Sequence, residues 1–479
     1  MAAKTTLNAK NLETLGLARL AELLIEISTG NAVAKRHLRL ALAGAQSPSE
    51  LIGEIKKRLT TVARSAAWID WRKRKALVSD LESQRRAIVE QVGPYDAAEA
   101  TELLWRFLEL ANPVFGRCDD GSGEVIAVFH EAVQDIGAVA SGAKLDPENL
   151  ADKVLYAVKA NGYGQYDGII ETLADALGKP GLTILKQRIA AERSAAPPTG
   201  KPKHREVVAW GSAGPFYADE LEGRHRQSAF TLALRQIADA QGDVDGFIAH
   251  QTEAARKLPH VAASIAQRLL AAARPLEALA ALEFADRDRL RLGGLEWEET
   301  YIEVLEALDR RADAQRARLD AFERSLEGGF LRAFLKRLPD FEDVEAEEVI
   351  LEQILRHPDA HAALSFFVGW PALALAARLV ADRTTEFDGD RYEVLSPAAE
   401  KLSAKQPLAA ILLWRAMITF ALTRNRVKRY RHAARHLEEC ARVSGQVGAY
   451  GDVETHDAFV AKLRADHLRK VAFWAEVEI

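Results

Sequence analysis

The sequence predicts an all-α fold, in which helical hairpins form a tetratricopeptide-like α-solenoid after an N-terminal helical domain. Apolar residues recur three and four positions apart, as at Leu20, Leu23 and Ile27, and this spacing is typical of amphipathic helices. Strand signals are scarce, because the best β-branched or aromatic runs, at 125–129 and 207–210, have no alternating partner nearby. Proline, which opens a helix easily and continues one badly, precedes helix-like runs at Asp146-Pro147, Arg274-Pro275, His357-Pro358, Ser396-Pro397 and Gln406-Pro407.

The bulk composition excludes several classes of protein. The 479 residues are 48% hydrophobic and 28% charged, which excludes disorder of the whole chain. A net charge of -5 is modest for this length, so binding of nucleic acid would need a local basic patch. Cys118 and Cys440 lie too far apart for a CxxC element and provide no disulfide framework, so we expect a reducing, cytoplasmic location.

Two segments bear on targeting and on the membrane. Residues 1–16 contain lysines without a following apolar stretch, so we expect no secretory signal. Residues 360–377 contain no Asp, Glu, Lys or Arg, but Gly369-Trp370-Pro371 interrupts them in the middle. We therefore expect two buried helices in this segment and no membrane span.

Composition also predicts the domain boundaries. Residues 1–191 predict an N-terminal α-helical domain, in which Ser47-Pro48-Ser49-Glu50 combines an N-cap serine with a first-turn proline and glutamate. Residues 192–216 concentrate Pro, Gly and Ser, which is typical of a linker or a long loop. We expect the tetratricopeptide-like helical repeat domain to extend over residues 217–479.

The segment 258–285 shows the expected repeat unit most clearly, as two short helices that meet at Arg274-Pro275. Since neither helix can bury its apolar stripe alone, each pair must pack on further pairs. Comparable pairs occur at 230–256 and 297–326, and the pairs begin three to four dozen residues apart, roughly as tetratricopeptide repeats do. The two predicted stripes of the central pair are Val261, Ile265 and Leu269, and Leu276, Leu279, Ala280 and Phe284.

The segment YAVKANGYG at 156–164 resembles the part of alanine-racemase-type enzymes in which a lysine forms a Schiff base with pyridoxal phosphate. The resemblance implies that role for Lys159, whose amine would need a lowered pKa. That family has an α/β barrel, whereas Asp146-Pro147 starts a helix here and no alternation of strands and helices follows. The residues themselves favour a helix over 148–160 that ends at Asn161-Gly162.

A possible metal site lies in the sequence RHAARHLEEC, where His432, His436 and Cys440 are spaced four residues apart. Imidazole and thiolate groups bind metals, and histidines one helical turn apart can share an ion. No second cysteine pair, no HExxH glutamate and no fourth ligand accompanies them. Histidines that pack between helices or lie on the surface are therefore the favoured interpretation, and no cofactor is predicted.

Two basic clusters contain aromatic residues. The first extends over 56–75, with Trp68 and Trp71 among its lysines and arginines. The second surrounds Tyr430, and no acidic residue occurs from 424 to 436. Cations beside aromatic rings suit a nucleic-acid strand or an acidic peptide, although a solvated helix face has the same pattern. The candidate residues of the second cluster are Arg424, Arg426, Lys428, Arg429, Arg431 and Arg435.

Several segments together resemble a bacterial family, mostly alphaproteobacterial, that is defined as a domain of unknown function and covers nearly the whole chain. They are NLETLGLARLAELLIEISTGN, KRHLRLALAG and RSAAWIDW near the N-terminus, and YRHAARHLEECARVSG and FVAKLRADHLRKVAFW near the C-terminus. The C-terminal part is similar to the helical-repeat region that follows the zinc finger of SWIM-type proteins, but the CxC and CxH of that finger are absent. The resemblance implies helical repeats and a bacterial cytoplasmic protein, and it supplies no catalytic residues.

These observations predict a non-enzymatic helical-repeat scaffold that binds a protein or peptide partner, since paired amphipathic helices occur without a catalytic constellation. The alternative is a protein that binds nucleic acid or another anionic partner through the second basic cluster. A metal-dependent or pyridoxal-phosphate-dependent enzyme is the remote alternative. No membrane association is predicted.

Overall fold

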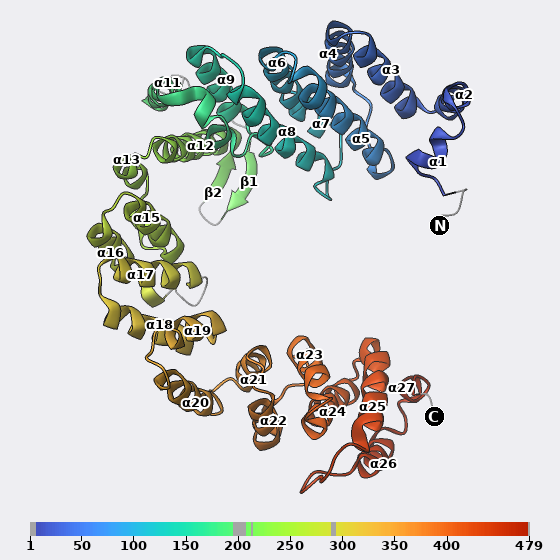
Figure 1. Ribbon diagram of the computed structural model, residues 1–479, viewed down its shortest axis with the longest axis vertical. Coiled ribbons are helices and arrows are strands. Elements are labelled where there is room, and N and C mark those ends of the chain that lie inside the picture. Colours follow the sequence, from blue (N-terminus) through green and yellow to red (C-terminus); the bar gives the residue numbers. More distant parts are fainter. Residues whose placement is uncertain (1–5, 195–206, 212–213, 289–293, 478–479) are drawn as a thin grey trace. The chain divides into compact units, whose positions relative to one another are not determined.

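The computed structural model describes residues 6–194, 207–211, 214–288 and 294–477. Helices contain most of these residues, and the strands among them are two short antiparallel ones (Figure 1). The prediction of an all-α fold is confirmed. The chain divides into two compact units, Met1–Glu253 and Ala254–Ile479.

The first unit is a set of helices with one β-hairpin beside them. The strands β1 and β2 pair from Val207 with Tyr217 to Gly211 with Gly214, so part of the predicted linker at 192–216 is a hairpin, and 195–206 and 212–213 lie outside the described residues. The elements are α1 (Ala9–Glu13), α2 (Leu17–Ser28), α3 (Ala32–Gln46), α4 (Pro48–Arg64), α5 (Trp71–Ala87), the π-helical turn η1 (Ile88–Val92), α6 (Ala97–Leu108), α7 (Ala111–Phe115), α8 (Glu124–Ser141), α9 (Pro147–Ala160), α10 (Ile169–Thr172), α11 (Ala174–Ser194), β1 (Val207–Gly211), β2 (Gly214–Tyr217), α12 (Ala218–Ala240) and α13 (Val244–Ala249).

The core of this unit lies among α4, α6, α8, α9 and α11, where Phe107 and Phe129 are fully buried with ring centroids 5.5 Å apart. The predicted N-cap is confirmed, since the Ser47 hydroxyl accepts a hydrogen bond from the Glu50 amide at 3.2 Å. Helix α12 packs on α9, α10 and α11. The first unit therefore continues past the predicted boundary at 192–216 and ends at Glu253.

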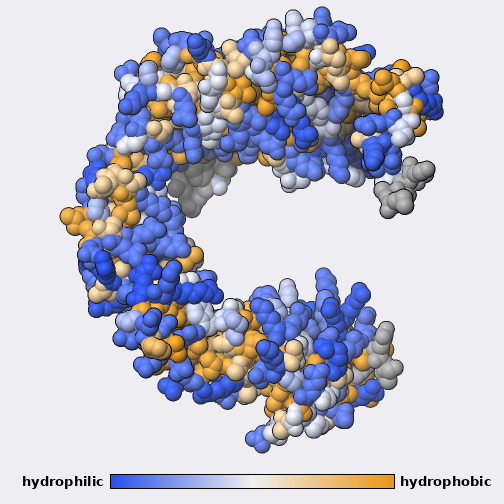
Figure 2. Space-filling model, viewed as in Figure 1, coloured by the Kyte–Doolittle hydropathy of each residue, from blue (hydrophilic) through white to orange (hydrophobic). Residues whose placement is uncertain are grey.

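The predicted apolar stripe of α2 is only partly buried. Leu20 and Leu23 are half-buried, whereas Ile27 is exposed and Leu17 is 89% exposed. Helix α2 packs on α3 and, less extensively, on α1. Figure 2 shows hydrophobic side chains at the surface around α2. Periodicity located this helix correctly, but it contains no information on how much of the apolar stripe another helix covers.

The second unit is made of helices in succession, most of which pack on the next one along the chain (Figure 1). They are α15 (Pro259–Ala271), α16 (Pro275–Glu283), α17 (Leu295–Ala307), α18 (Arg311–Ser325), α19 (Gly328–Leu335), α20 (Glu342–Ile354), α21 (Ala360–Gly369), α22 (Leu373–Asp382), the 3-10 turn η3 (Thr384–Glu386), α23 (Tyr392–Leu402), α24 (Pro407–Thr423), the 3-10 turn η4 (Val427–Arg429), α25 (Tyr430–Ser444), α26 (His456–His467) and α27 (Val471–Trp474), while α14 (Glu253–Arg256) lies at the division between the units.

The predicted pair at 258–285 is present as α15 and α16, but one of its stripes was wrong. Ile265 and Leu269 are buried as expected. In α16 the buried residues are Ala278 and Leu282, and Leu276 is 72% exposed. The buried side of α16 therefore lies about half a turn away from Leu276.

The segment 360–377 confirms its prediction. It forms α21 and the start of α22, with a break at Trp370, and Leu364 and Phe367 are fully buried between neighbouring helices. Among the described residues, no helix has the length and apolar character that crossing a bilayer would require.

The same backbone turn ends several helices. In each case one residue has a positive φ, and the amide after it donates to a carbonyl five residues earlier at 2.8–2.9 Å, which is the Schellman motif. The motif lets the next helix begin at once and return along the first. The donor and acceptor pairs are Asp243 N to Ala238 O, Arg274 N to Leu269 O, Arg310 N to Leu305 O and Arg426 N to Ala421 O.

Candidate functional site

A pocket of about 490 Å³ lies between α23, α24 and α25 in the second unit. Helix α24 packs on both α23 and α25. On α25 the apolar residues Tyr430, Ala433, Leu437 and Cys440 are buried, because they recur at the helical period. The polar residues between them are therefore free to face α23 across the pocket.

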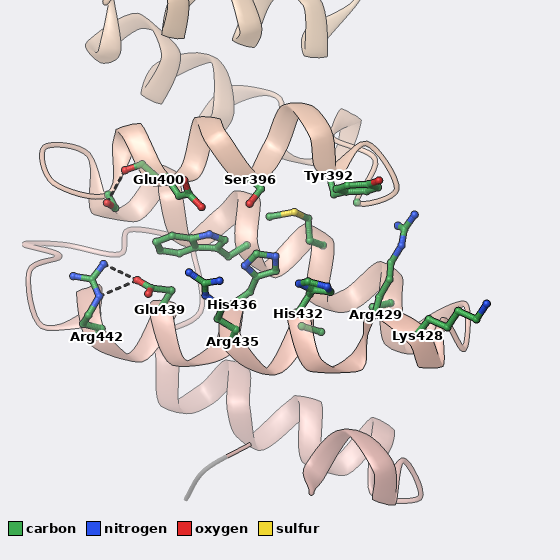
Figure 3. Close-up of a pocket in the computed structure, with 16 residues that line it drawn as sticks. Tyr392, Ser396, Glu400, Lys428, Arg429, His432, Arg435, His436, Glu439 and Arg442 are labelled. Atoms are coloured by element: carbon green, nitrogen blue, oxygen red, sulfur yellow. Dashed lines mark hydrogen bonds and ion pairs between the residues drawn. The ribbon is translucent and has the colours of Figure 1, made fainter. Parts of the chain in front are cut away.

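Polar and charged side chains from α23, η4 and α25 line the pocket, together with apolar side chains from α24. Figure 3 shows Tyr392, Ser396 and Glu400 on α23 across the pocket from the labelled residues of α25. Trp414 and Met417 contribute apolar surface from α24. The lining from η4 and α25 is Lys428, Arg429, His432, Ala433, Arg435, His436, Glu439 and Arg442.

The loop before α23 contacts both α21 and α24. The imidazole Nε2 of His361 accepts a hydrogen bond from the Asp388 amide at 3.0 Å. A Cβ at Gly389 would lie 2.3 Å from the Ala416 carbonyl oxygen, so only glycine allows this approach. The loop thereby places Asp390 against Arg429, with 2.7 Å between the Oδ1 and Nη1 atoms.

The pocket has more cationic than anionic side chains. Arg442 donates from Nε and Nη2 to Glu439 Oε2 at 2.8 and 2.6 Å, which neutralises one carboxylate. The guanidinium of Arg429 lies over the Tyr392 ring, 4.8 Å from its centroid. Within the described part of the chain, Lys428 and Arg435 form no ion pair. Their charges are available to an anionic ligand.

His436 is uncharged near neutral pH. Burial, with smaller contributions from the neighbouring His432 and Arg435, lowers the pKa of its imidazole to about 4. A neutral imidazole has one donor and one acceptor nitrogen. His436 can therefore form a hydrogen bond in the pocket without adding a charge.

The structure separates the three residues that the sequence analysis considered as a metal site. His432 and His436 line the pocket, but Cys440 is fully buried, with its Sγ 3.9 Å from the Ile411 carbonyl oxygen. Eight residues along a helix correspond to a rotation of about 80° beyond two full turns, so the thiol faces the core. Burial also raises the pKa of Cys440 to about 12. Among the described residues, no group of three His, Cys, Asp or Glu side chains is arranged to hold a metal.

Three of the six residues predicted for the anionic-partner patch meet at the pocket. Lys428, Arg429 and Arg435 line it. Arg424 and Arg431 are exposed elsewhere, and Arg426 lies over the Phe420 ring, 5.9 Å from its centroid. A basic run spans all faces of a helix, so only residues at the helical period converge on one site.

Sequence reasoning missed Arg442 and the whole of the α23 wall. Arg442 lies two turns after Arg435 on the same face, and the helical period could have found it. Tyr392, Ser396 and Glu400 come from a different helix, and nothing in their local sequence indicates that they face α25.

Lys159 lies in an α-helix near its C-terminus and not at the end of a barrel strand. It is in α9, which ends at Asn161 as the residues predicted, and its Nζ is 2.8 Å from Glu192 Oε1 on α11. The surroundings required by the resemblance to alanine-racemase-type enzymes are absent from the described residues around it.

The first basic cluster lies in the first unit, and several of its cations pair with carboxylates. Arg58 donates from Nε to Asp80 Oδ2 at 2.9 Å, and Arg74 Nε is 2.8 Å from Glu124 Oε2. Trp68 and Trp71 are 61% and 65% exposed, so they point away from the core.

Comparison with known proteins places the chain in a family. The model of the family of unknown function DUF6880 matches residues 2–476. The chain belongs to this family. The DUF6880 match includes both compact units, so the family is defined by the two units together and not by the pocket-bearing one alone. No curated protein matches the chain.

Proposed function

We propose that the chain is a non-enzymatic helical-repeat scaffold of the cytoplasm, whose second unit binds an acidic segment of a protein partner between α23 and α25. The observation that carries this proposal is the pocket of about 490 Å³, where Lys428 and Arg435 form no ion pair with any described residue and the exposed ring of Tyr392 is part of the lining.

The recurrence of similar helix pairs supports the tetratricopeptide-like description. Successive pairs in the second unit begin about three dozen residues apart, close to the roughly 34 residues of a tetratricopeptide repeat. The similarity of the C-terminal sequence to the helical-repeat region of SWIM-type proteins points the same way. The first helices of the pairs start at Pro259, Leu295, Gly328, Ala360, Tyr392 and Tyr430.

The chemistry of the pocket suits a peptide better than a phosphate chain. Carboxylates of an acidic peptide can pair with Lys428 and Arg435. Apolar side chains can pack beside Tyr392, which is part of the lining and is 54% exposed. The carboxylate of Glu400 also lines the pocket, and it would repel a continuous run of phosphates. A peptide that alternates acidic and apolar residues avoids this repulsion.

Fluorescence anisotropy with a labelled acidic peptide tests the proposal. We expect the full chain to bind a peptide of alternating Glu and Leu residues, and the Lys428→Glu, Arg435→Glu double variant to bind at least about tenfold more weakly. The matched control is Lys73→Glu, Lys75→Glu in the first unit, which changes net charge equally and should leave affinity within about twofold. Equal losses for both variants, or no binding by the native chain, would overturn the proposal.

A second candidate function is binding of single-stranded nucleic acid by the first unit. The specific observation is that Trp68 and Trp71 are more than half exposed, Trp71 at the start of α5 and Trp68 in the loop before it. Arg117 holds this loop, since its guanidinium donates to the Ala67 and Val62 carbonyl oxygens at 3.1 and 3.2 Å. Bases stack on such rings, and Lys73 and Lys75 lie nearby in sequence. Binding of a labelled oligonucleotide that weakens steeply with salt and with Trp68→Ala would support this candidate.

A further inference from the structure

The described surface of the second unit includes an acidic segment with an exposed aromatic residue. Phe341 is 82% exposed at the start of α20, and acidic residues both precede and follow it in the sequence DFEDVEAEE at 340–348. Nearly all of this ring is in contact with water, so its burial against a partner would be favourable. The segment has the composition that the pocket between α23 and α25 would select.

The backbone of Phe341 is strained. Its φ is 76°, in the region that favours glycine, and a bulky side chain there costs about 1 kcal/mol or more. The turn is nevertheless well formed, since the Glu342 amide donates to the Pro339 carbonyl oxygen at 3.1 Å. A strained and exposed aromatic residue is typical of a functional position.

One face of α20 combines this aromatic residue with free carboxylates. Phe341, Val344, Glu345 and Glu348 recur at the helical spacing and are exposed. On the other side of the helix, Glu347 Oε1 accepts from Trp370 Nε1 at 2.6 Å. Glu352, one turn after Glu348 on the same face, pairs with Arg378 at 2.7 Å. In the described part of the chain, Glu345 and Glu348 form no ion pair.

We infer that the acidic face of α20 in one copy of the chain docks in the pocket between α23 and α25 of a second copy. This inference rests on the function proposed above and names its partner. The carboxylates of Glu345 and Glu348 would pair with Lys428 and Arg435, and the Phe341 ring would pack beside Tyr392, which lines the pocket and is 54% exposed. Helix α20 packs on α19 within the same compact unit as the pocket, so its position in its own chain is already occupied by that packing. The segment that enters the pocket therefore comes from a second copy.

The contact is heterologous, because the two surfaces are different parts of the chain. It gives a two-fold dimer if each copy binds the other, and a chain of copies if it does not close. Since it depends on a few exposed charges, it is weak and sensitive to salt. We expect the average mass to rise above the 52.7 kDa of one chain as concentration increases, and to return to it in about 0.5 M salt.

A charge exchange between the two surfaces tests the inference by sedimentation equilibrium of the full chain. The Lys428→Glu, Arg435→Glu variant alone and the Glu345→Lys, Glu348→Lys variant alone should each remain monomeric. An equimolar mixture of the two should associate again, because each reversed surface meets its complement. Association of either variant alone, or a mixture that stays monomeric while the native chain associates, would overturn the inference.

Phe341→Gly provides a second variant that does not endanger folding, because glycine accepts the positive φ. We expect it to weaken association at least about fivefold and to leave thermal stability unchanged or slightly higher. A synthetic peptide of residues 338–352 separates the two proposals. If the peptide of alternating Glu and Leu binds the chain but the 338–352 peptide does not and the native chain stays monomeric, only this inference fails. If neither peptide binds, the proposed function fails as well.

Discussion

The two basic clusters of the chain have similar compositions but different surroundings. In the first unit, Arg36 and Arg58 both contact Asp80, a carboxylate whose side chain is 2% exposed, at 3.2 Å and 2.9 Å from their Nε atoms. In the second unit, the cations of η4 and α25 line a pocket, and Lys428 and Arg435 have no carboxylate partner among the described residues. The first arrangement stabilises the packing of α3, α4 and α5, and the second leaves charge for a ligand.

The difference comes from carboxylates that lie far away in the sequence. Asp80 is separated from Arg58 by 22 residues, and Glu124 from Arg74 by 50 residues. Whether a basic run binds a partner or stabilises the fold therefore depends on the acidic residues that the fold brings to it. Measurements on single carboxylates in each cluster can test this contrast.

The largest effect is expected for Asp80→Asn. Because Asp80 is buried between two arginines, loss of its charge leaves both guanidinium groups without an ionic partner, at a cost of about 3 kcal/mol. Urea unfolding monitored by circular dichroism would show this as an earlier transition of the first unit. Glu54→Gln is the matched control, since Glu54 pairs with the exposed Lys57 and its removal should cost less than about 0.5 kcal/mol. Equal effects of the two substitutions would contradict the contrast.

In the pocket, the free energy of unfolding should depend on the pH through His436. Its pKa is about 4 in the folded chain and about 6.5 when unfolded, so the unfolded state takes up the proton first as the pH falls. The stability associated with neutral His436 is complete above about pH 6.5 and is lost as the pH falls toward 4. We expect the stability of the native chain relative to His436→Gln to decrease by about 2 kcal/mol between pH 7 and pH 4.5.

A proton NMR titration of the His436 ring checks the same point independently of unfolding. The midpoint should lie near pH 4, and Arg435→Gln should move it upward, because one repelling charge is removed. A midpoint near 6.5 in the native chain would mean that water reaches the ring freely, and it would remove the expected pH dependence.

Much of the fold could be predicted from local signals. The N-cap at Ser47, the helix end at Asn161 and the break at Trp370 all follow from backbone hydrogen bonding within a few residues, and the structure confirms each. The buried side of α16 and the exposure of α2 depend on which neighbour packs where. Amphipathic spacing alone does not contain that information.

The candidate site was only half predictable for the same reason. The run from Arg424 to Arg435 marked α25 as unusual, and helical spacing would have selected Lys428 and Arg435 from it and added Arg442 two turns further along the same face. Tyr392 and Glu400 complete the pocket because α23 packs on α24, which is a tertiary event. Cys440 does not join His432 at the pocket, because eight residues are not a whole number of helical turns.

A smaller effect is expected for Asp390→Asn beside the pocket. The pair of Asp390 and Arg429 is about one-third exposed, so its loss should cost less than about 1 kcal/mol in stability. The freed guanidinium adds a cation to the pocket, and anisotropy should show affinity for the acidic peptide rising by about twofold to threefold. A fall in affinity would indicate that Asp390 is needed to hold Arg429 in position.

The smallest effect on stability is expected for Trp68→Ala. Trp68 is 61% exposed, and the loop that bears it is held by the hydrogen bonds of Arg117 and by the Ile69 amide, which donates to the Arg117 carbonyl oxygen at 2.9 Å. Removal of the indole should therefore change the free energy of unfolding by less than about 0.5 kcal/mol. Trp297→Ala is the matched control in the second unit, since Trp297 is buried and donates from Nε1 to the Leu282 carbonyl oxygen, and it should cost about 3 kcal/mol or more. A large cost for Trp68→Ala would show that the exposed ring supports the fold and would remove the observation on which binding of single-stranded nucleic acid by the first unit depends.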